Sequence, residues 1–466
     1  MRVHGGPRFS RASAGRRREY REMTLKRIAA WFLKSPRGAA VLVILVALVL
    51  RVGFAVWYVG VNEIKHASVP WFSLDRSVQA ILDADGYTDH AREIVWDGPY
   101  RRTSKQPLVP LYHALVFAVF GEHPTLFYNR LADAVVAALG CGVVYLLARR
   151  MFGQTVGLIA GLLAATNANM IHKSGYIFSE TWAVPLCALA LYFFVGFADS
   201  RKWRDLVLGA VFLGLATLAR ATTYHMIYLL PLWLWVVYGR VNRRMLVRSA
   251  ALVGIVVVMI LPWAIRISIL DGQVTAVSTR LWTVLGGAYG PAQFEQPLGD
   301  NKGLWIEPWD SGLFTAAELK DLAPLSELQR QPAFKRRFFE YLPTIWYRVP
   351  DLMLCRMVTF IGPSSRSGLF FRAYEAQQTV LFVLFLGGLW IARAQWRRFS
   401  ILYLAYLYLG VFQILILYGG SRNRLYSDPI ILAFAAAYLV WLCERFLRRR
   451  AGTQKAANAV APDRRA

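Results

Sequence analysis

Long apolar runs alternate with short polar segments along most of this 466-residue chain. The clearest run, residues 39–60, is as long as the roughly 20 residues that cross a bilayer as a helix. The runs predict helices at 39–60, 126–148, 155–171, 181–198, 249–270, 375–392, 399–418 and 429–443, with two more inside 206–238. The pattern therefore predicts an all-α, polytopic transmembrane protein of about ten spans.

The stretch 206–238 allows one long helix or two short helices separated at Arg220. An arginine at the membrane midplane is costly, whereas two short helices place it at the membrane surface. Two helices also bring the basic loop 240–248 to the same side as the other basic loops. We therefore expect two helices in this stretch.

Two polar regions separate the apolar runs. The first, 61–125, includes a part after Pro110 that is short for a span, and we expect amphipathic helices on the outer membrane surface there. The second, 271–374, is rich in Trp, Pro and Gly and is expected to form an outer loop region. The predicted organisation is a basic tail (1–38), an N-terminal transmembrane module (39–270), this outer region, C-terminal transmembrane helices (375–446) and a disordered tail (447–466).

Composition supports a membrane protein. Apolar residues make up 56% of the chain and charged residues only 18%, whereas soluble domains are about 25% charged. The net charge of +26 comes from Arg and Lys at the ends of apolar runs, which marks cytoplasmic loops and argues against nucleic-acid binding. Both termini are expected in the cytoplasm, and the Arg- and Ala-rich composition suggests a bacterial inner membrane. The first run lacks a small-residue cleavage site and is expected to be an uncleaved anchor.

The spacing of the cysteines and histidines does not indicate a metal centre. The four cysteines are scattered without a CxxC pair, and no histidines show the HExxH spacing of a zinc enzyme. We expect no required cofactor, although a divalent ion between an aspartate and a phosphate remains conceivable.

Seven charged residues fall on the predicted outer face. A carboxylate there can accept a proton from a hydroxyl nucleophile, and an arginine can hold phosphate oxygens through its planar fork. Ionisable groups beside a membrane are costly and often functional. The candidate catalytic acids are Asp83, Asp85 and Glu180, and the candidate phosphate ligands are Arg220, Arg266, Arg422 and Arg424.

Each candidate also has a structural interpretation. Asp83 shares a helix face with Tyr87, which suggests a base beside a substrate contact, but aspartate is also a common helix cap. Glu180 at a helix start is favoured by the helix dipole alone. Arg422 and Arg424 bind either phosphate or anionic headgroups, and Arg266 near a helix end is able to snorkel. These alternatives stay open at the level of sequence.

Several short motifs occur in a recognisable order. They are Leu50-Arg51, Asp83-x-x-x-Tyr87, Pro107-x-x-Pro110-Leu111, Arg149-Arg150-Met-Phe-Gly153, Ser179-Glu180-Thr181, Leu218-Ala-Arg220, Pro262-Trp263-x-x-Arg266 and Arg422-x-Arg424. Over residues 38–446 this order resembles the GT-C glycosyltransferases, especially bacterial relatives of the protein O-mannosyltransferases and the lipid A aminoarabinose transferases.

The resemblance implies transfer of a sugar from a polyprenyl-phosphate donor on the extracytoplasmic face. The acceptor is a hydroxyl of a glycan, lipid or protein. The family's catalytic aspartate corresponds to Asp83 and its second outer acid to Glu180. Family members often have Asp-Glu at the first position, whereas here Ala84 follows and Asp85 comes next. The outer arginines correspond to residues that bind the donor phosphate.

Two other functions compete with an enzyme. A flippase or transporter of lipid-linked sugars would place charges near the midplane and show paired repeats, whereas these charges gather at one surface. A non-catalytic scaffold would use 271–374 to bind a partner and would tolerate loss of both Asp83 and Glu180.

Overall fold

The computed structural model describes residues 31–32, 35–65, 86–96, 98, 100–123, 126–278, 280–295, 303–304, 306–361 and 369–460. Over these residues the chain is helical and contains no strand, which confirms the all-α class. The helices are α2 (Pro36–Lys65), α4 (Tyr87–Val95), α5 (Leu108–Phe120), α6 (Phe127–Phe152), α7 (Gln154–Thr166), α8 (Ala168–Ser174), α9 (Glu180–Ser200), α10 (Trp203–Ala219), α11 (Met226–Tyr238), α12 (Arg243–Asp271), α13 (Leu281–Tyr289), α14 (Pro291–Glu295), α15 (Ala316–Leu322), α16 (Glu327–Ile345), α17 (Val349–Ile361), α18 (Leu369–Ala392), α19 (Ser400–Ala405), the π-helical η5 (Tyr406–Phe412), α20 (Gln413–Ile416), α21 (Ser421–Arg424) and α22 (Asp428–Val460).

Six of the described helices are long and apolar enough to cross a bilayer: α2, α6, α9, α12, α18 and α22. Three shorter apolar stretches are Leu108–Phe120, Gln154–Thr166 and Ser400–Ile416. The chain is therefore an integral membrane protein, and the number of about ten spans stays a prediction.

The predicted interruption at Arg220 is present. Helix α10 ends at Ala219, Arg220 has an extended backbone (φ −156°, ψ 130°), and α11 begins at Met226. The expected span 155–171 is instead divided between α7 and α8. Asn167 separates them with an extended backbone, and its side chain caps α8 by accepting from the Met170 amide at 3.0 Å.

Two polar regions contain more helix than the pattern predicts. The region 271–374 holds α13 to α17, and α22 continues past its predicted span to Val460. The extension of α22 is rich in Ala and Arg, which are strong helix formers, and it has no apolar stripe that would reveal the helix in the sequence.

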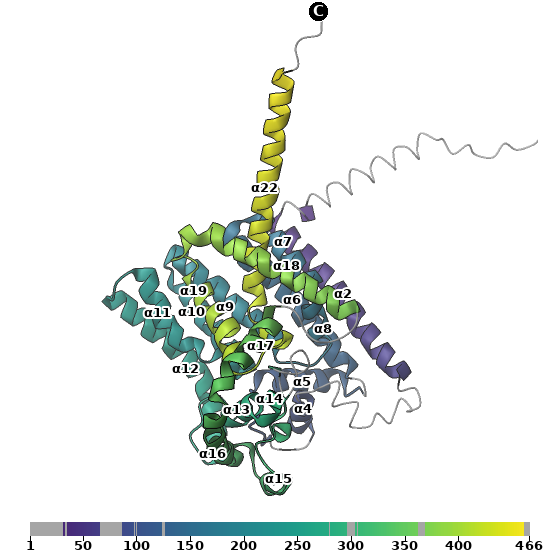
Figure 1. The fold of residues 1–466 in the computed structure, drawn as a ribbon, viewed down its shortest axis with the longest axis vertical. Coiled ribbons are helices and arrows are strands. Elements are labelled where there is room, and N and C mark those ends of the chain that lie inside the picture. Colours follow the sequence, from purple (N-terminus) through teal and green to yellow (C-terminus); the bar gives the residue numbers. More distant parts are fainter. Residues whose placement is uncertain are drawn as a thin grey trace, which may run out of the picture.

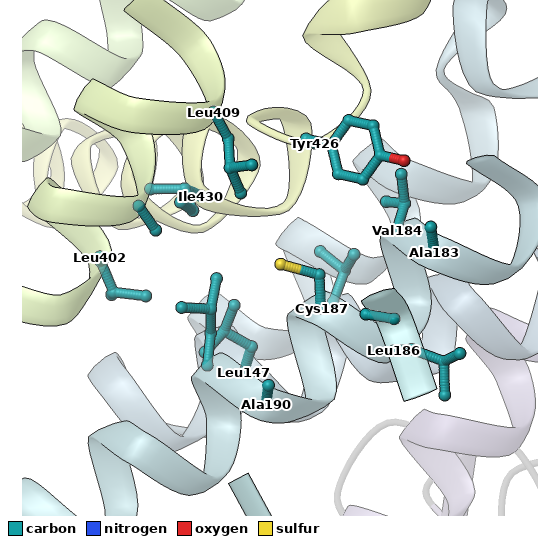
Figure 2. Packing of buried hydrophobic residues seen from close by; sticks show 14 of the residues in the cluster. Leu147, Ala183, Val184, Leu186, Cys187, Ala190, Leu402, Leu409, Tyr426 and Ile430 are labelled. Atoms are coloured by element: carbon teal, nitrogen blue, oxygen red, sulfur yellow. The ribbon is translucent and has the colours of Figure 1, made fainter. Parts of the chain in front are cut away.

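The membrane helices pack closely through small residues. A Cβ at Gly388 of α18 would lie 2.2 Å from the Phe434 carbonyl oxygen of α22, and a Cβ at Gly161 of α7 would lie 2.8 Å from Val43 of α2. Close backbone approach at glycine is typical of helix contacts in membranes. Figure 2 shows part of the resulting core, where Leu147, Cys187 and Ile430 come from α6, α9 and α22.

One end of the bundle carries basic side chains that join neighbouring segments through ion pairs. Arg150 lies 3.3 Å from Asp205, and Arg398 lies 2.6 Å from Asp199. Tyr145 donates to the Pro36 carbonyl at 2.8 Å, so the start of α2 lies at this end too. The last turns of α6 and α9 therefore meet the start of α2 here. We call this the basic end.

The opposite end carries the polar regions. Figure 1 shows α4, α5 and α13 to α16 gathered away from the C-terminal part of α22. The buried Arg356 of α17 joins this layer to the bundle by donating to the carbonyls of Ala288 at 2.5 Å and Leu415 at 2.7 Å. We call this the loop end.

Candidate functional site

Glu180 is the centre of the candidate site. It opens α9 at the loop end, and its side chain is only 1% exposed. Arg422 binds it as a fork: Nε lies 2.5 Å from Oε1 and Nη2 lies 3.0 Å from Oε2. Bidentate geometry of this kind is strong and fixes both side chains.

A second arginine shares the same carboxylate. Arg220 Nη1 lies 2.9 Å from Glu180 Oε1 and also donates to Ser179 Oγ at 3.0 Å. The interruption between α10 and α11 makes this possible, because it places Arg220 at the end of a helix. One carboxylate therefore holds two guanidinium groups, and these three side chains carry one net positive charge.

An aromatic residue backs this cluster. The guanidinium of Arg422 lies 3.9 Å from the ring centroid of Phe178, close enough for a cation–π interaction. The ring of Tyr176 stacks on the ring of Phe178, with the two centroids 5.5 Å apart. The segment 176–180 thus presents an aromatic wall and a carboxylate together.

The cluster borders an open pocket, and Glu180 is one of its lining residues. Its charged lining residues are Arg51, Lys173 and Glu180, and most of the remaining wall is apolar. The lining residues come from α2, α6, α8, α9, the start of α22 and the segments that lead into α9 and α22: Arg51, Ala137, Gly140, Val144, Met170, Lys173, Ser174, Phe178, Glu180, Thr181, Val184, Pro185, Ala188, Leu425 and Pro429.

Tyr87 belongs to the same end of the molecule. It opens α4 and is buried. Tyr426, which is also buried, interacts electrostatically with Arg220, Glu180 and Tyr87. The start of α4 therefore lies near the arginine cluster. Asp83 and Asp85, which precede it in the sequence, lie outside the described residues.

The other two predicted phosphate ligands make different contacts. Arg424 is buried in an ion pair with Asp428 at 3.3 Å and donates to the Phe360 carbonyl at 3.1 Å. Arg266 donates to the carbonyls of Tyr100 and Arg102, at 2.5 Å and 3.3 Å. The structure thus brings Glu180, Arg220 and Arg422 together, whereas the described contacts of Arg266 and Arg424 join other segments.

Contacts around His90 join α4 to the segment that follows it. Its ring nitrogens lie 2.7 Å from Tyr100 Oη and 3.2 Å from Ser104 Oγ. Burial, together with the positive charges of Arg102, Lys105 and Arg266, lowers the pKa of His90 to about 3. His90 is therefore neutral at physiological pH.

Sequence reasoning missed two cations of the pocket. Arg51 is buried and donates to the carbonyls of Ala164 and Ala165 at 3.3 Å and 3.2 Å, which caps the C-terminal end of α7. Lys173 stands in the last turn of α8. Arg51 belongs to one of the motifs but had no assigned role, and no local pattern distinguishes Lys173 from the many other lysines and arginines.

No group of three or more His, Cys, Asp and Glu side chains in the described part of the chain is arranged to hold a metal ion. The expectation that the protein requires no cofactor stays a prediction, because Asp83 and Asp85 are not among those residues.

Comparison with known proteins gives a family match over part of the chain. Residues 104–265 match the model of the family described as dolichyl-phosphate-mannose-protein mannosyltransferase. Over 162 residues the chain is 34% identical to the undecaprenyl phosphate-alpha-4-amino-4-deoxy-L-arabinose arabinosyl transferase of Pseudomonas paraeruginosa. This alignment covers 33% of the chain and 29% of the relative, so the chain spans less than a third of the length of the curated relatives it matches.

Solved structures show a shared fold over most of the chain. The apo oligosaccharyltransferase of Archaeoglobus fulgidus matches with a TM-score of 0.53 and 15% identity, covering 92% of this chain and 53% of that one. An archaeal oligosaccharyltransferase from Archaeoglobus fulgidus in complex with an inhibitory peptide and a dolichol-phosphate matches with a TM-score of 0.51 and 15% identity, covering 93% of this chain and 53% of that one. The resemblance to the GT-C glycosyltransferases is thereby confirmed, in fold over most of the chain and in sequence over residues 104–265.

Proposed function

We propose that this protein transfers a hexosyl or pentosyl unit from a polyprenyl-phosphate donor to an acceptor hydroxyl. Transfer takes place at the loop end, which faces the extracytoplasmic side of a bacterial inner membrane, with both termini in the cytoplasm. The acceptor belongs to a glycan, a lipid or a protein, and no cofactor is required. The curated relatives are named for transfer of a sugar from undecaprenyl phosphate, which supports the class of donor.

The observation that carries the proposal is the arrangement around Glu180. Two guanidinium groups converge on one buried carboxylate beside a pocket whose lining combines the charged side chains of Arg51, Lys173 and Glu180 with mostly apolar residues. Arginine forks match phosphate oxygens, and apolar walls suit a prenyl chain. A lipid phosphate combines both properties in one molecule.

The reaction exchanges one bond at the anomeric carbon. The acceptor oxygen attacks this carbon, the bond from the carbon to the phosphate oxygen breaks, and the hydroxyl proton passes to a carboxylate. Asp83, in the segment leading into α4, is the proposed base, and Asp85 is its neighbouring alternative. Tyr87 is proposed to contact the substrate.

The leaving phosphate gains negative charge as the bond breaks. Arg422 and Arg220 are proposed to neutralise this charge, since preorganised cations act most strongly where charge develops. Glu180 then serves as a positioning residue, because its two oxygens are occupied by the guanidinium groups that it orients. Arg266 and Arg424 support the surrounding segments.

The test is transfer of a labelled sugar by the purified full chain in proteoliposomes. A synthetic polyprenyl-phosphate sugar is the donor, and an envelope extract supplies acceptors whose products are identified by mass spectrometry. We expect Asp83→Asn to abolish transfer, with Asp89→Asn as the matched control, since Asp89 is half exposed on α4. Full transfer by Asp83→Asn would remove Asp83 from the role of base. Movement of the labelled lipid between leaflets without a new product would instead support a flippase.

A further inference from the structure

The turn after α10 determines where the guanidinium of Arg220 lies. Arg220 follows the last residue of α10, and the 3₁₀ turn η1 (Ala221–Thr223) comes directly after it. Arg220 Nη1 lies 2.9 Å from Glu180 Oε1, and Arg220 Nε donates to Thr222 Oγ1 at 3.3 Å. The orientation of this guanidinium therefore depends on the position of Thr222 as well as on Glu180.

Two side chains from a distant part of the chain hold Thr222. The hydroxyl of Tyr408 donates to the Thr222 carbonyl oxygen at 3.1 Å, and Gln413 Nε2 donates to the same oxygen at 3.0 Å. Gln413 Nε2 also donates to Tyr408 Oη at 3.2 Å, which joins the two donors to each other. The side chain of Gln413 is buried. The turn is thus attached to the C-terminal half of the bundle through one carbonyl.

The π-helical geometry of η5 brings Tyr408 and Gln413 together. Tyr408 lies in η5, and Gln413 begins α20 directly after it. On an α-helix, residues five positions apart are separated by about 140° around the axis. The i→i+5 repeat of a π-helix instead places them one turn apart on the same side, and such turns are frequent at functional sites. The wide turn therefore allows both side chains to reach one carbonyl.

Other contacts hold the turn independently of these two residues. Thr223 Oγ1 donates to the Arg220 carbonyl at 3.3 Å and lies 3.1 Å from Thr217 Oγ1 of α10. Loss of the Tyr408 hydroxyl leaves these contacts in place. The turn then stays folded, while the position of Thr222 is less restrained.

We propose that Tyr408 and Gln413 are positioning residues for sugar transfer, which orient Arg220 through Thr222. The inference rests on the proposed function, because it concerns a cation that neutralises the leaving phosphate there. A misplacement of about 1 Å can cost on the order of 100-fold in rate. Arg220 acts where charge develops in the transition state, so a poorly oriented guanidinium lowers kcat and leaves the KM for the donor unchanged.

The experiment measures sugar transfer by the full chain in proteoliposomes at several concentrations of a synthetic polyprenyl-phosphate sugar, together with thermal unfolding of each protein. Tyr408→Phe removes one hydroxyl, and we expect kcat to fall roughly 10-fold at an unchanged KM. Tyr403→Phe is the matched control on α19, because the Tyr403 hydroxyl has no hydrogen-bond partner among the described residues. Its kcat should stay within about twofold of the wild type.

A second variant tests whether Tyr408 acts through Arg220. Arg220→Lys keeps the positive charge but lacks the planar fork that bonds to Thr222 and Glu180 together. We expect Arg220→Lys to lower kcat, and we expect Tyr408→Phe to cause no further loss in the Arg220→Lys protein. Such non-additivity is the signature of two residues that act on one group.

The outcomes separate this inference from the function on which it rests. Wild-type protein that transfers no sugar overturns the proposed function and the inference together. Wild-type kcat in Tyr408→Phe or in Arg220→Lys overturns the inference alone. The same follows if Tyr408→Phe slows the Arg220→Lys protein as much as it slows the wild type. Gln413→Leu takes the place of Tyr408→Phe if that variant does not fold, and the same loss of kcat is expected.

Discussion

Replacement of Glu180 by glutamine tests the centre of the candidate site. The side chain is 1% exposed, and its carboxylate accepts charged hydrogen bonds from Arg220 and Arg422. Glutamine keeps the size and one oxygen but removes the negative charge. Two guanidinium groups then face each other without their shared counter-ion. Breaking a buried ion pair by removing one partner costs about 3–5 kcal/mol.

Arg220 and Arg422 remain partly solvated, so the lower part of that range applies, and we expect Glu180→Gln to lose about 3 kcal/mol of stability. The protein should unfold at a lower temperature in detergent, and transfer from the donor should be strongly reduced. Glu180→Asp keeps the charge and should lose less of both. The double variant Glu180→Gln/Arg422→Gln should lose less stability than the two single variants lose in sum. The reason is that the double variant also removes one of the two cations left unpaired by Glu180→Gln.

A specific result would refute this reasoning. If Glu180→Gln unfolds at the wild-type temperature and transfers sugar at the wild-type rate, the carboxylate does not hold the arginines in the way that the structure indicates. If stability falls but the rate of transfer by the folded fraction is unchanged, Glu180 stabilises the fold without positioning the reacting groups.

Three further predictions concern the surroundings of the site. Asp428→Asn should destabilise the bundle by about 3 kcal/mol in thermal unfolding, because Arg424 is buried against it, and an unchanged midpoint would contradict a structural role for this pair. Arg356→Met should release α13 to α16 from the bundle and raise proteolysis in 281–345 before global unfolding; equal cleavage of both proteins would argue against this anchor. The pKa of His90 is about 3 in the folded state and 6.5 in the unfolded state, so only the unfolded state binds a proton at this residue as the pH falls. The free energy of unfolding should therefore fall by about 1.5–2 kcal/mol from pH 6.5 to pH 5. His90→Gln should reduce this loss when unfolding is measured at both pH values.

The amino-acid sequence determined the helical class and the long apolar helices. Span length and burial in lipid produce long apolar runs, and such runs are a local property of the chain. The interruption at Arg220 was also predictable, because an arginine inside a membrane helix is costly wherever the helix packs. The split between α7 and α8 was less visible, since Asn167 interrupts an apolar stretch without a proline or a glycine beside it.

Only the tertiary structure decided which outer charges act together. Arg422 and Arg424 are separated by one residue, yet the first reaches Glu180 and the second is buried against Asp428. This difference depends on the direction in which each side chain leaves the short helix α21, and on the positions of α9 and α17 beside α21. The Glu180–Arg422 pair spans 242 residues of sequence. No local periodicity encodes such a contact, because it forms only after the helices have packed.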